Sequence, residues 1–231
     1  MSIIQPTDEK PPKFPPRPAI EIMPLQQMLD EHGPGEFQRG SRPRDHLYAS
    51  ELGHCPRSVW LEWHHPRPRD ETFSRGRGAL GHAVEHLMKE NLRPFLVADE
   101  VTFRDEMVSG RADFFLRLGK GYPQFPAELK TTLAYDRFCS EPMREHVLQL
   151  QWYLSQEPSA PYGVLIYYNL SGWGGKMGEW TALVIPRDDA GVSAVAKKLW
   201  AIVHQSKEPE CEEPGKCFWC DIAAGTEMKP V

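Results

Sequence analysis

Glu128 and Lys130 are the residues of this chain whose types and spacing most directly suggest chemistry. They lie two positions apart on a predicted strand, so both side chains point to the same face. Asp113 lies on the strand predicted before it. Two carboxylates on neighbouring strands can hold a divalent cation, and a lysine can steady the attacking water or the developing charge. The set indicates metal-assisted phosphodiester hydrolysis, but a Glu-x-Lys pair is also common as a solvated strand face with an ion pair.

Further polar side chains that could join such a site lie on two predicted helices. His82 and Glu85 are three positions apart on one helix, and Gln149 and Tyr153 are four apart on the other. Each residue also has an ordinary interpretation, as a surface or boundary position of an amphipathic helix. Their order along the chain, their spacing and the type of element that carries them favour a common site.

A second possible metal site is indicated by the cysteines, of which the chain has five. Cys217 and Cys220 form a Cys-x-x-Cys pair that can reach one metal, and Cys211 is close enough to add a third thiolate. Cys55 precedes Pro56, a residue that suits the first turn of a helix, where the helix dipole favours a thiolate. By chemistry alone these thiolates suit zinc as well as an iron–sulfur cluster. Cys139 is expected to be an ordinary buried thiol.

Composition places the chain among globular proteins. It has 231 residues, of which 40% are hydrophobic and 26% charged. No apolar run approaches the ~20 residues that a membrane span needs, and residues 1–18 lack the apolar core of a secretory signal. We therefore expect a cytoplasmic protein with no membrane partner. The net charge of −5 argues against general attraction to nucleic acid but allows a local basic groove.

The predicted elements divide the chain into a proline-rich arm at residues 1–45, a folded domain at 46–222 and a tail at 223–231. The arm is expected to be extended, with one short helix at 24–31. The remaining helices are predicted at 56–63, 77–92, 141–156 and 188–204, and the strands at 101–103, 108–116, 125–131, 163–169 and 179–185. This order favours an α/β fold with a central mixed sheet flanked by helices.

Four segments, at 78–82, 110–113, 128–130 and 149–153, resemble the successive motifs of the RecB-like branch of the PD-(D/E)XK nuclease superfamily. A cysteine before the first motif and three after the last are similar to its iron–sulfur members. These include the CRISPR-associated RecB-like exonuclease family and the nuclease domains of AddB-type helicase–nucleases. The resemblance covers about residues 46–222. It implies a restriction-endonuclease-like core in which a [4Fe-4S] cluster joins the N- and C-terminal segments.

The resemblance also implies a role for each matching residue. Asp113 and Glu128 would bind Mg²⁺ or Mn²⁺ together with the carbonyl oxygen of Leu129, and His82 would be a further ligand. Lys130 would position the nucleophilic water or stabilise the phosphate.

Around these residues the family places supporting groups. Gln149 and Tyr153 would contact the DNA strand and support the site, and Glu85 is a weaker candidate for a second metal or for support of the first. Cys55, Cys211, Cys217 and Cys220 would hold the cluster, with zinc as the alternative.

The activity that the resemblance implies is a DNA exonuclease that acts on single-stranded ends and leaves 5′-phosphates. The arginines between residues 57 and 77 could follow phosphates, and Trp60 or Tyr153 could stack bases, but a solvated loop is an equal interpretation of those arginines. Alternatives are an endonuclease that trims DNA for CRISPR spacer acquisition and a non-catalytic DNA-binding subunit of a recombination or repair complex. Recombination or CRISPR adaptation proteins are possible partners.

One feature departs from the family pattern. Many relatives place the close Cys-x-x-Cys pair before the distant cysteine, whereas here the wider gap, from Cys211 to Cys217, comes first. This order leaves the ligand set open, and His54, which precedes Cys55, is an alternative ligand in a zinc site.

Overall fold

A computed structural model describes residues 44–65, 71–171, 177–212, 217 and 220. The predicted helix at 24–31, most of the proline-rich arm and the C-terminal tail lie outside these residues. In the described part of the chain, no helix combines the length and apolar character that crossing a lipid bilayer requires.

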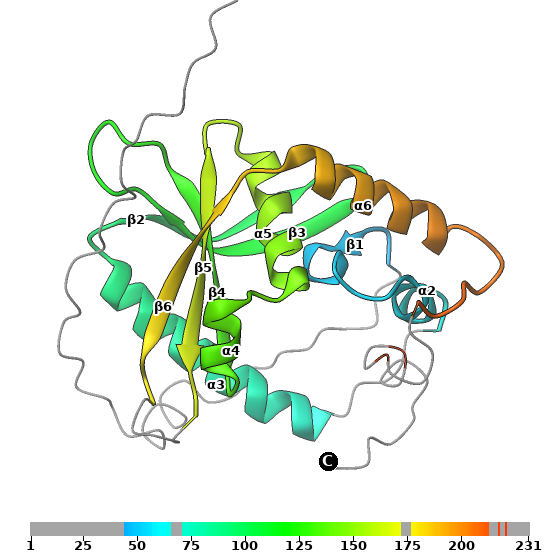
Figure 1. Ribbon diagram of the computed structural model, residues 1–231, viewed down its shortest axis with the longest axis horizontal. Coiled ribbons are helices and arrows are strands. Elements are labelled where there is room, and N and C mark those ends of the chain that lie inside the picture. Colours follow the sequence, from blue (N-terminus) through cyan, green and yellow to red (C-terminus); the bar gives the residue numbers. More distant parts are fainter. Residues whose placement is uncertain (1–43, 66–70, 172–176, 213–216, 218–219, 221–231) are drawn as a thin grey trace, which may run out of the picture.

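One mixed sheet forms the centre of the fold, which confirms the predicted architecture (Figure 1). Its strands are β1 (Leu47–Tyr48), β2 (Leu96–Arg104), β3 (Val108–Leu116), β4 (Phe125–Thr132), β5 (Tyr162–Asn169) and β6 (Trp180–Pro186). The strand order is β1-β3-β4-β5-β6, and β2 pairs with β3. The β1–β3 and β4–β5 pairs are parallel, and the other pairs are antiparallel.

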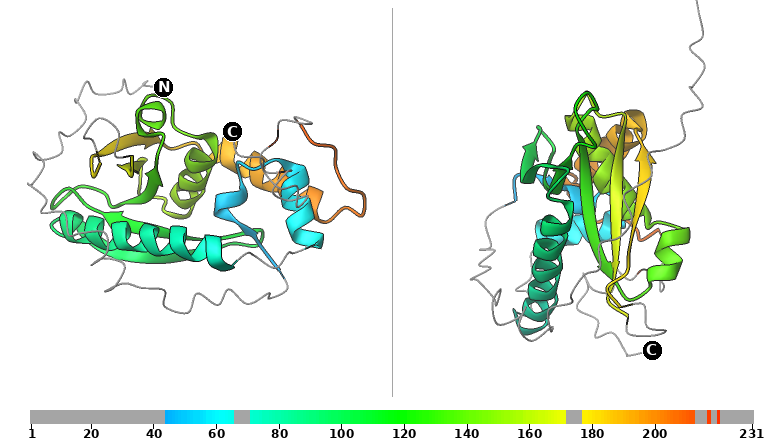
Figure 2. Two further views of the ribbon diagram at one scale, coloured as in Figure 1. Left: turned by 90° about the horizontal axis from the view of Figure 1, so that it is seen from below. Right: turned by 90° about the vertical axis from the view of Figure 1, so that its left-hand side faces the viewer.

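Helices cover both faces of the sheet (Figure 2). The helical segments are η1 (Ala49–Glu51), α2 (Pro56–His64), α3 (Glu71–Leu92), α4 (Tyr135–Ser140), α5 (Arg144–Gln156) and α6 (Asp189–Val203). On one face α3 packs Val84 and Met88 among side chains such as Phe114 of β3. On the other face α5 and α6 pack against residues such as Phe115, the next residue of β3. These two neighbouring residues of the strand therefore face different cores.

Most predicted elements are present, with three differences. The helix predicted at 77–92 begins earlier, at Glu71, and the strand predicted at 101–103 extends to Leu96–Arg104. The helix predicted at 141–156 begins at Arg144, after a separate short helix, α4. Pro142 lies between the two helices, and a proline cannot donate the backbone hydrogen bond that a continuous helix would need there.

The sheet forks between β3 and β4. β4 pairs with β3 through residues 114–116, and β1 pairs with residues 108–109 on the same side. Within the described chain, residues 110–113 of β3 have no strand partner on that side. Helix α5 lies over this gap, and a Cβ atom on Gly110 would come within 2.9 Å of ring atoms of Trp152 and Tyr153. Glycine therefore allows the helix to approach the fork closely.

We predict that Gly110→Ala destabilises the protein by roughly 1–3 kcal/mol, because the added methyl group overpacks the contact between β3 and α5. The matched control is Gly81→Ala, since a Cβ atom there meets nothing within 4 Å and alanine favours the helix. Urea unfolding followed by circular dichroism measures both changes. Equal stability of Gly110→Ala and the parent would contradict the packing described for the fork.

Candidate active site

Glu128 is the most enclosed charged group of the fork, with 2% of the residue exposed. Its Oε1 atom accepts hydrogen bonds from Lys130 Nζ at 2.8 Å and from Gln149 Nε2 at 2.7 Å. Its Oε2 atom is buried and has no hydrogen-bond partner within the described chain. Burial, and next the charge of Asp113, raise the pKa of Glu128 to about 8. A cation that reached the free oxygen would stabilise the anionic form of this carboxyl group.

Asp113 connects the two strands where their ladder ends. Its Oδ2 atom accepts a hydrogen bond of 2.7 Å from the backbone N–H of Leu129. Burial raises the pKa of Asp113, although the positive charge of Lys130 and this hydrogen bond act in the opposite direction. The side chain therefore replaces a missing backbone contact and places a second carboxyl group beside Glu128.

Helix α3 supplies a third carboxyl group and an imidazole to this region. Burial raises the pKa of Glu85 to about 7, and the next contribution comes from the charge of Asp113. His82 Nδ1 lies 3.4 Å from Glu85 Oε2. The donor atoms of His82, Asp113 and Glu128 do not all lie within 4.8 Å of one another. Among the described residues, only the group of four cysteines has its donor atoms that close together.

Gln149 and Tyr153 support the site from helix α5. Gln149 accepts a hydrogen bond from Lys130 Nζ at 2.8 Å and donates one to the Tyr153 hydroxyl at 3.0 Å. The Tyr153 hydroxyl donates to the carbonyl oxygen of Arg111 at 2.8 Å, inside the unpaired stretch of β3. Tyr153 is 1% exposed, so its ring has no free face on which a base could stack. Stacking on Trp60 is also excluded in this structure, because that residue is buried too.

Lys130 is the cation of the network. Burial alone would lower its pKa, but the charges of Glu128 and Asp113 outweigh that effect and raise it above the usual value. The side chain therefore stays an ammonium group, and it can donate to Glu128, to Gln149 and to one further oxygen. This arrangement places a fixed positive charge beside a pair of buried carboxyl groups.

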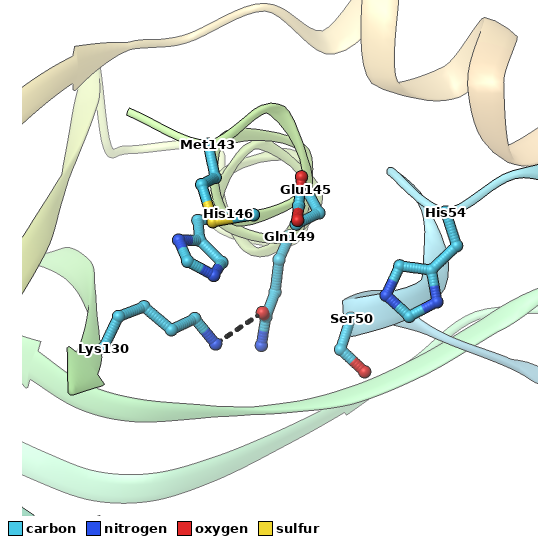
Figure 3. Close-up of a pocket in the computed structure, with 7 residues that line it drawn as sticks. All are labelled: Ser50, His54, Lys130, Met143, Glu145, His146 and Gln149. Carbon is cyan, nitrogen blue, oxygen red and sulfur yellow. Dashed lines mark hydrogen bonds between the residues drawn. The ribbon is translucent and has the colours of Figure 1, made fainter. Parts of the chain in front are cut away.

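A cavity of about 540 Å³ opens beside Lys130 and Gln149 (Figure 3). In that view Lys130 and His146 lie on one side of it and Ser50 and His54 on the other. Met143 and Glu145 complete the lining. Its size lies within the range of ligand pockets. The sequence analysis did not assign His146 to the site, although its position on the helix face of Gln149, three residues earlier, could have suggested it.

The four cysteines that the sequence singled out come together. Cys220 Sγ lies 3.5 Å from Cys55 Sγ and 3.4 Å from Cys211 Sγ, and with Cys217 all four sulfurs lie within 4.8 Å of one another. They form no disulfides. Burial would raise the pKa of Cys55, but hydrogen bonds from backbone N–H groups and from Cys220 lower it below the usual value. The group links the start of α2 to the C-terminal segment.

These thiolates fit a metal centre by chemistry and by spacing. Around a tetrahedral ion with metal–sulfur bonds of about 2.3 Å, neighbouring sulfurs lie about 3.8 Å apart, close to the spacing here. In a four-iron cluster each cysteine sulfur binds a different iron atom, so the cysteine sulfurs must lie farther apart than around a single ion. His54 is not a member of this group, and its imidazole lines the cavity instead. Cys139 lies apart on α4 as a partly buried thiol.

Comparison with known proteins bears on the fold. No protein-family model matches the sequence, and no curated protein does. The chain is similar to the crystal structure of SSO0001, with 21% identity and a TM-score of 0.50 over 77% of this chain and 83% of that one. A crystal structure of an alkaline exonuclease, LHK-Exo from Laribacter hongkongensis, has 14% identity and a TM-score of 0.49 over 70% and 87%. The same exonuclease with dAMP has 13% identity and a TM-score of 0.49 over 69% and 86%.

We predict that the stability of the magnesium- and manganese-free protein, with its cysteine centre loaded, falls as the pH rises from 6 to 9. The pKa of Glu128 in the folded state is raised, so the folded protein holds the proton more tightly than the unfolded chain. This contribution to stability is fully present below the pKa that Glu128 has in the unfolded chain. It is lost as the pH rises through the folded-state pKa of about 8. We expect a loss of roughly 1–3 kcal/mol, measured as Tm against pH.

Glu128→Gln is the control for this titration, because the amide carries no proton that titrates in the range. The fall of Tm with pH should be smaller in that variant. At pH 9, Mg²⁺ or Mn²⁺ should restore the Tm of the parent but not that of the variant. The same pH dependence in both proteins would contradict the assignment to Glu128.

Proposed function

We propose that this chain is a divalent-metal-dependent DNA nuclease of the RecB-like PD-(D/E)XK type. The observation that carries the proposal is the state of Glu128, which shares one oxygen with Lys130 and Gln149 and keeps the other buried without a partner. A buried carboxylate with an unsatisfied oxygen beside a second acid is a suitable position for a hard cation. The lysine two residues later supplies the positive charge that phosphodiester hydrolysis needs.

The residues that would hold Mg²⁺ or Mn²⁺ are Asp113, Glu128 and the carbonyl group of Leu129, with His82 and Glu85 contributing from α3. When bound, the cation supplies an activated water and stabilises charge on the phosphate. Lys130 orients the water and donates to a phosphate oxygen. Gln149 and Tyr153 fix Glu128 and Lys130 through their hydrogen bonds. Hydrolysis forms a bond from water oxygen to phosphorus and breaks the bond to the 3′-oxygen, which leaves a 5′-phosphate.

The substrate proposed is the end of a single DNA strand. The cavity beside Lys130 is large enough for about one nucleotide, which supports action at an end. An endonuclease that trims DNA for CRISPR spacer acquisition and a non-catalytic DNA-binding subunit of a recombination or repair complex are the alternatives. A catalytic protein is favoured over the non-catalytic DNA-binding subunit, because Asp113, Glu128 and Lys130 are all present.

We predict that the purified protein degrades end-labelled single-stranded DNA in Mg²⁺ or Mn²⁺ and leaves circular single strands intact. Glu128→Ala and Lys130→Ala should each lower the rate about 100-fold or more, because each removes a charge that the transition state requires. Gel analysis of 5′- and 3′-labelled strands and of duplexes measures polarity and strand preference.

Two exposed residues provide matched controls for these substitutions, Glu106→Ala and Lys120→Ala, and both should cleave at the parent rate. Cleavage of circular strands would favour the endonuclease alternative. DNA binding without any cleavage would favour the non-catalytic subunit. Full activity of Glu128→Ala would show that the site is elsewhere.

We also propose that the cysteine group holds a metal centre, for which the family resemblance implies a [4Fe-4S] cluster and the alternative is zinc. The spacing of the sulfurs is the observation that favours zinc. Either occupant would join the two ends of the domain, as a disulfide does in secreted proteins.

We predict that Cys220→Ser lowers Tm by several degrees, since it removes a ligand from the link between α2 and the C-terminal segment. Cys139→Ser is the control and should change Tm little. Anaerobic preparation, visible absorption and iron, sulfide and zinc analysis identify the occupant. A brown protein with iron and sulfide supports the cluster, and a colourless protein with stoichiometric zinc rules it out.

A further inference from the structure

His146 lies in the first turn of α5 and lines the cavity beside Lys130 (Figure 3). It is one helical turn before Gln149, the residue that holds Glu128 and Lys130. The role proposed for the site so far makes no use of this imidazole.

Tyr167 of β5 is the hydrogen-bond partner of His146 Nδ1. The Tyr167 hydroxyl oxygen accepts a hydrogen bond of 3.3 Å from the backbone N–H of Met143, and it lies 2.9 Å from His146 Nδ1. The hydroxyl can then donate its own proton to Nδ1, and in that arrangement a neutral ring carries its proton on Nε2.

The ring remains neutral in this position. Burial, and next the charge of Lys130, lower the pKa of His146 to about 3. A neutral ring with a protonated Nε2 donates one hydrogen bond but adds no charge and transfers no proton at neutral pH. Within the described chain, Nδ1 is the ring nitrogen that makes a hydrogen bond, and Nε2 makes none.

We propose that His146 binds the DNA strand by donating its Nε2–H to a phosphate oxygen next to the bond that is cleaved, and that Tyr167 is the positioning residue that holds it in this tautomer. This inference rests on the proposed nuclease function. Lys130 and His146 present two donors on one side of the cavity, which suits an oxygen-rich anion. Glu145 lines the same cavity, so the phosphate belongs on the side of the two donors and the rest of the nucleotide faces the carboxylate.

DNA binding is tested in the uncleaving Glu128→Gln background, by fluorescence anisotropy with a labelled single-stranded oligonucleotide and Mg²⁺. Adding His146→Phe keeps the ring shape and removes the donor, and we expect about tenfold weaker binding, the equivalent of one hydrogen bond to a charged group. Adding His146→Gln, which places an amide N–H near the position of Nε2–H, should restore most of the affinity. The control His204→Phe, on an exposed histidine after α6, should bind as the background protein does.

The role of Tyr167 is tested by a double-mutant cycle and by the tautomer itself. Tyr167→Phe should weaken binding alone but have no further effect in the presence of His146→Phe. Nitrogen-15 NMR of the imidazole should show the proton on Nε2 in the parent and a mixture of tautomers in Tyr167→Phe. Melting curves establish that each variant is folded.

Four outcomes overturn the inference. If the protein with His146→Phe binds DNA as tightly as the Glu128→Gln background, His146 does not contact the phosphate. If the imidazole proton of the parent is on Nδ1, Nε2 cannot be the donor. If the parent cleaves DNA and the His146 variants cleave it equally well, the nuclease function stands and only this inference fails. If the parent neither binds nor cleaves DNA, the proposed function fails, and this inference fails with it.

Discussion

The burial of a carboxyl pair in a forked sheet is the constraint on which the rest of the site depends. Glu128 and Asp113 lie where the ladder between β3 and β4 ends, so they do not face each other as an ordinary backbone pair. Side chains from elsewhere must satisfy both the carboxyl groups and the exposed edge of β3. Lys130 and Gln149 bond one oxygen of Glu128, and Tyr153 bonds the carbonyl oxygen of Arg111 at the edge of β3, in one connected set of hydrogen bonds. The polar network is therefore as much a part of the fold as the two apolar cores.

This connection explains why one helix has both structural and chemical importance. Helix α5 contributes Leu150 and Tyr153 to the core on one face of the sheet, and Gln149 to the carboxyl pair. Gly110 lets it lie close to β3. A change that tilts α5 would move the support of Glu128 and the wall of the cavity together, because both are on the same rigid element.

Local patterns in the sequence were sufficient for much of this structure. The apolar run of β5, the amphipathic period of α6 and the strand that carries Glu128 and Lys130 each have a strong local signal, and the observed elements differ from the predictions by a residue or two. The four cysteines could also be grouped from sequence, although only by a resemblance that brought Cys55 to the other three.

Other features depend on contacts that no local pattern encodes. β1 is two residues long and is defined by its pairing with β3, far along the chain. Tyr153 has the same helical spacing whether it faces solvent or the core, so only the packed structure shows that its ring is enclosed. The tautomer of His146 depends on a hydroxyl group of β5 and on a backbone N–H before α5. These are tertiary effects, which sequence spacing cannot resolve.

The link between Cys55 and the C-terminal cysteines has a consequence for how the domain is completed during synthesis. Cys55 and Cys220 are separated by 165 positions, so the contact closes a loop that contains β2 to β6. Contacts of such long range form late, since the intervening chain must be ordered first. A growing chain can therefore place Ser50 and His54 through the pairing of β1 with β3 before Cys220 arrives, and the cysteine group adds a second attachment of this wall of the cavity last.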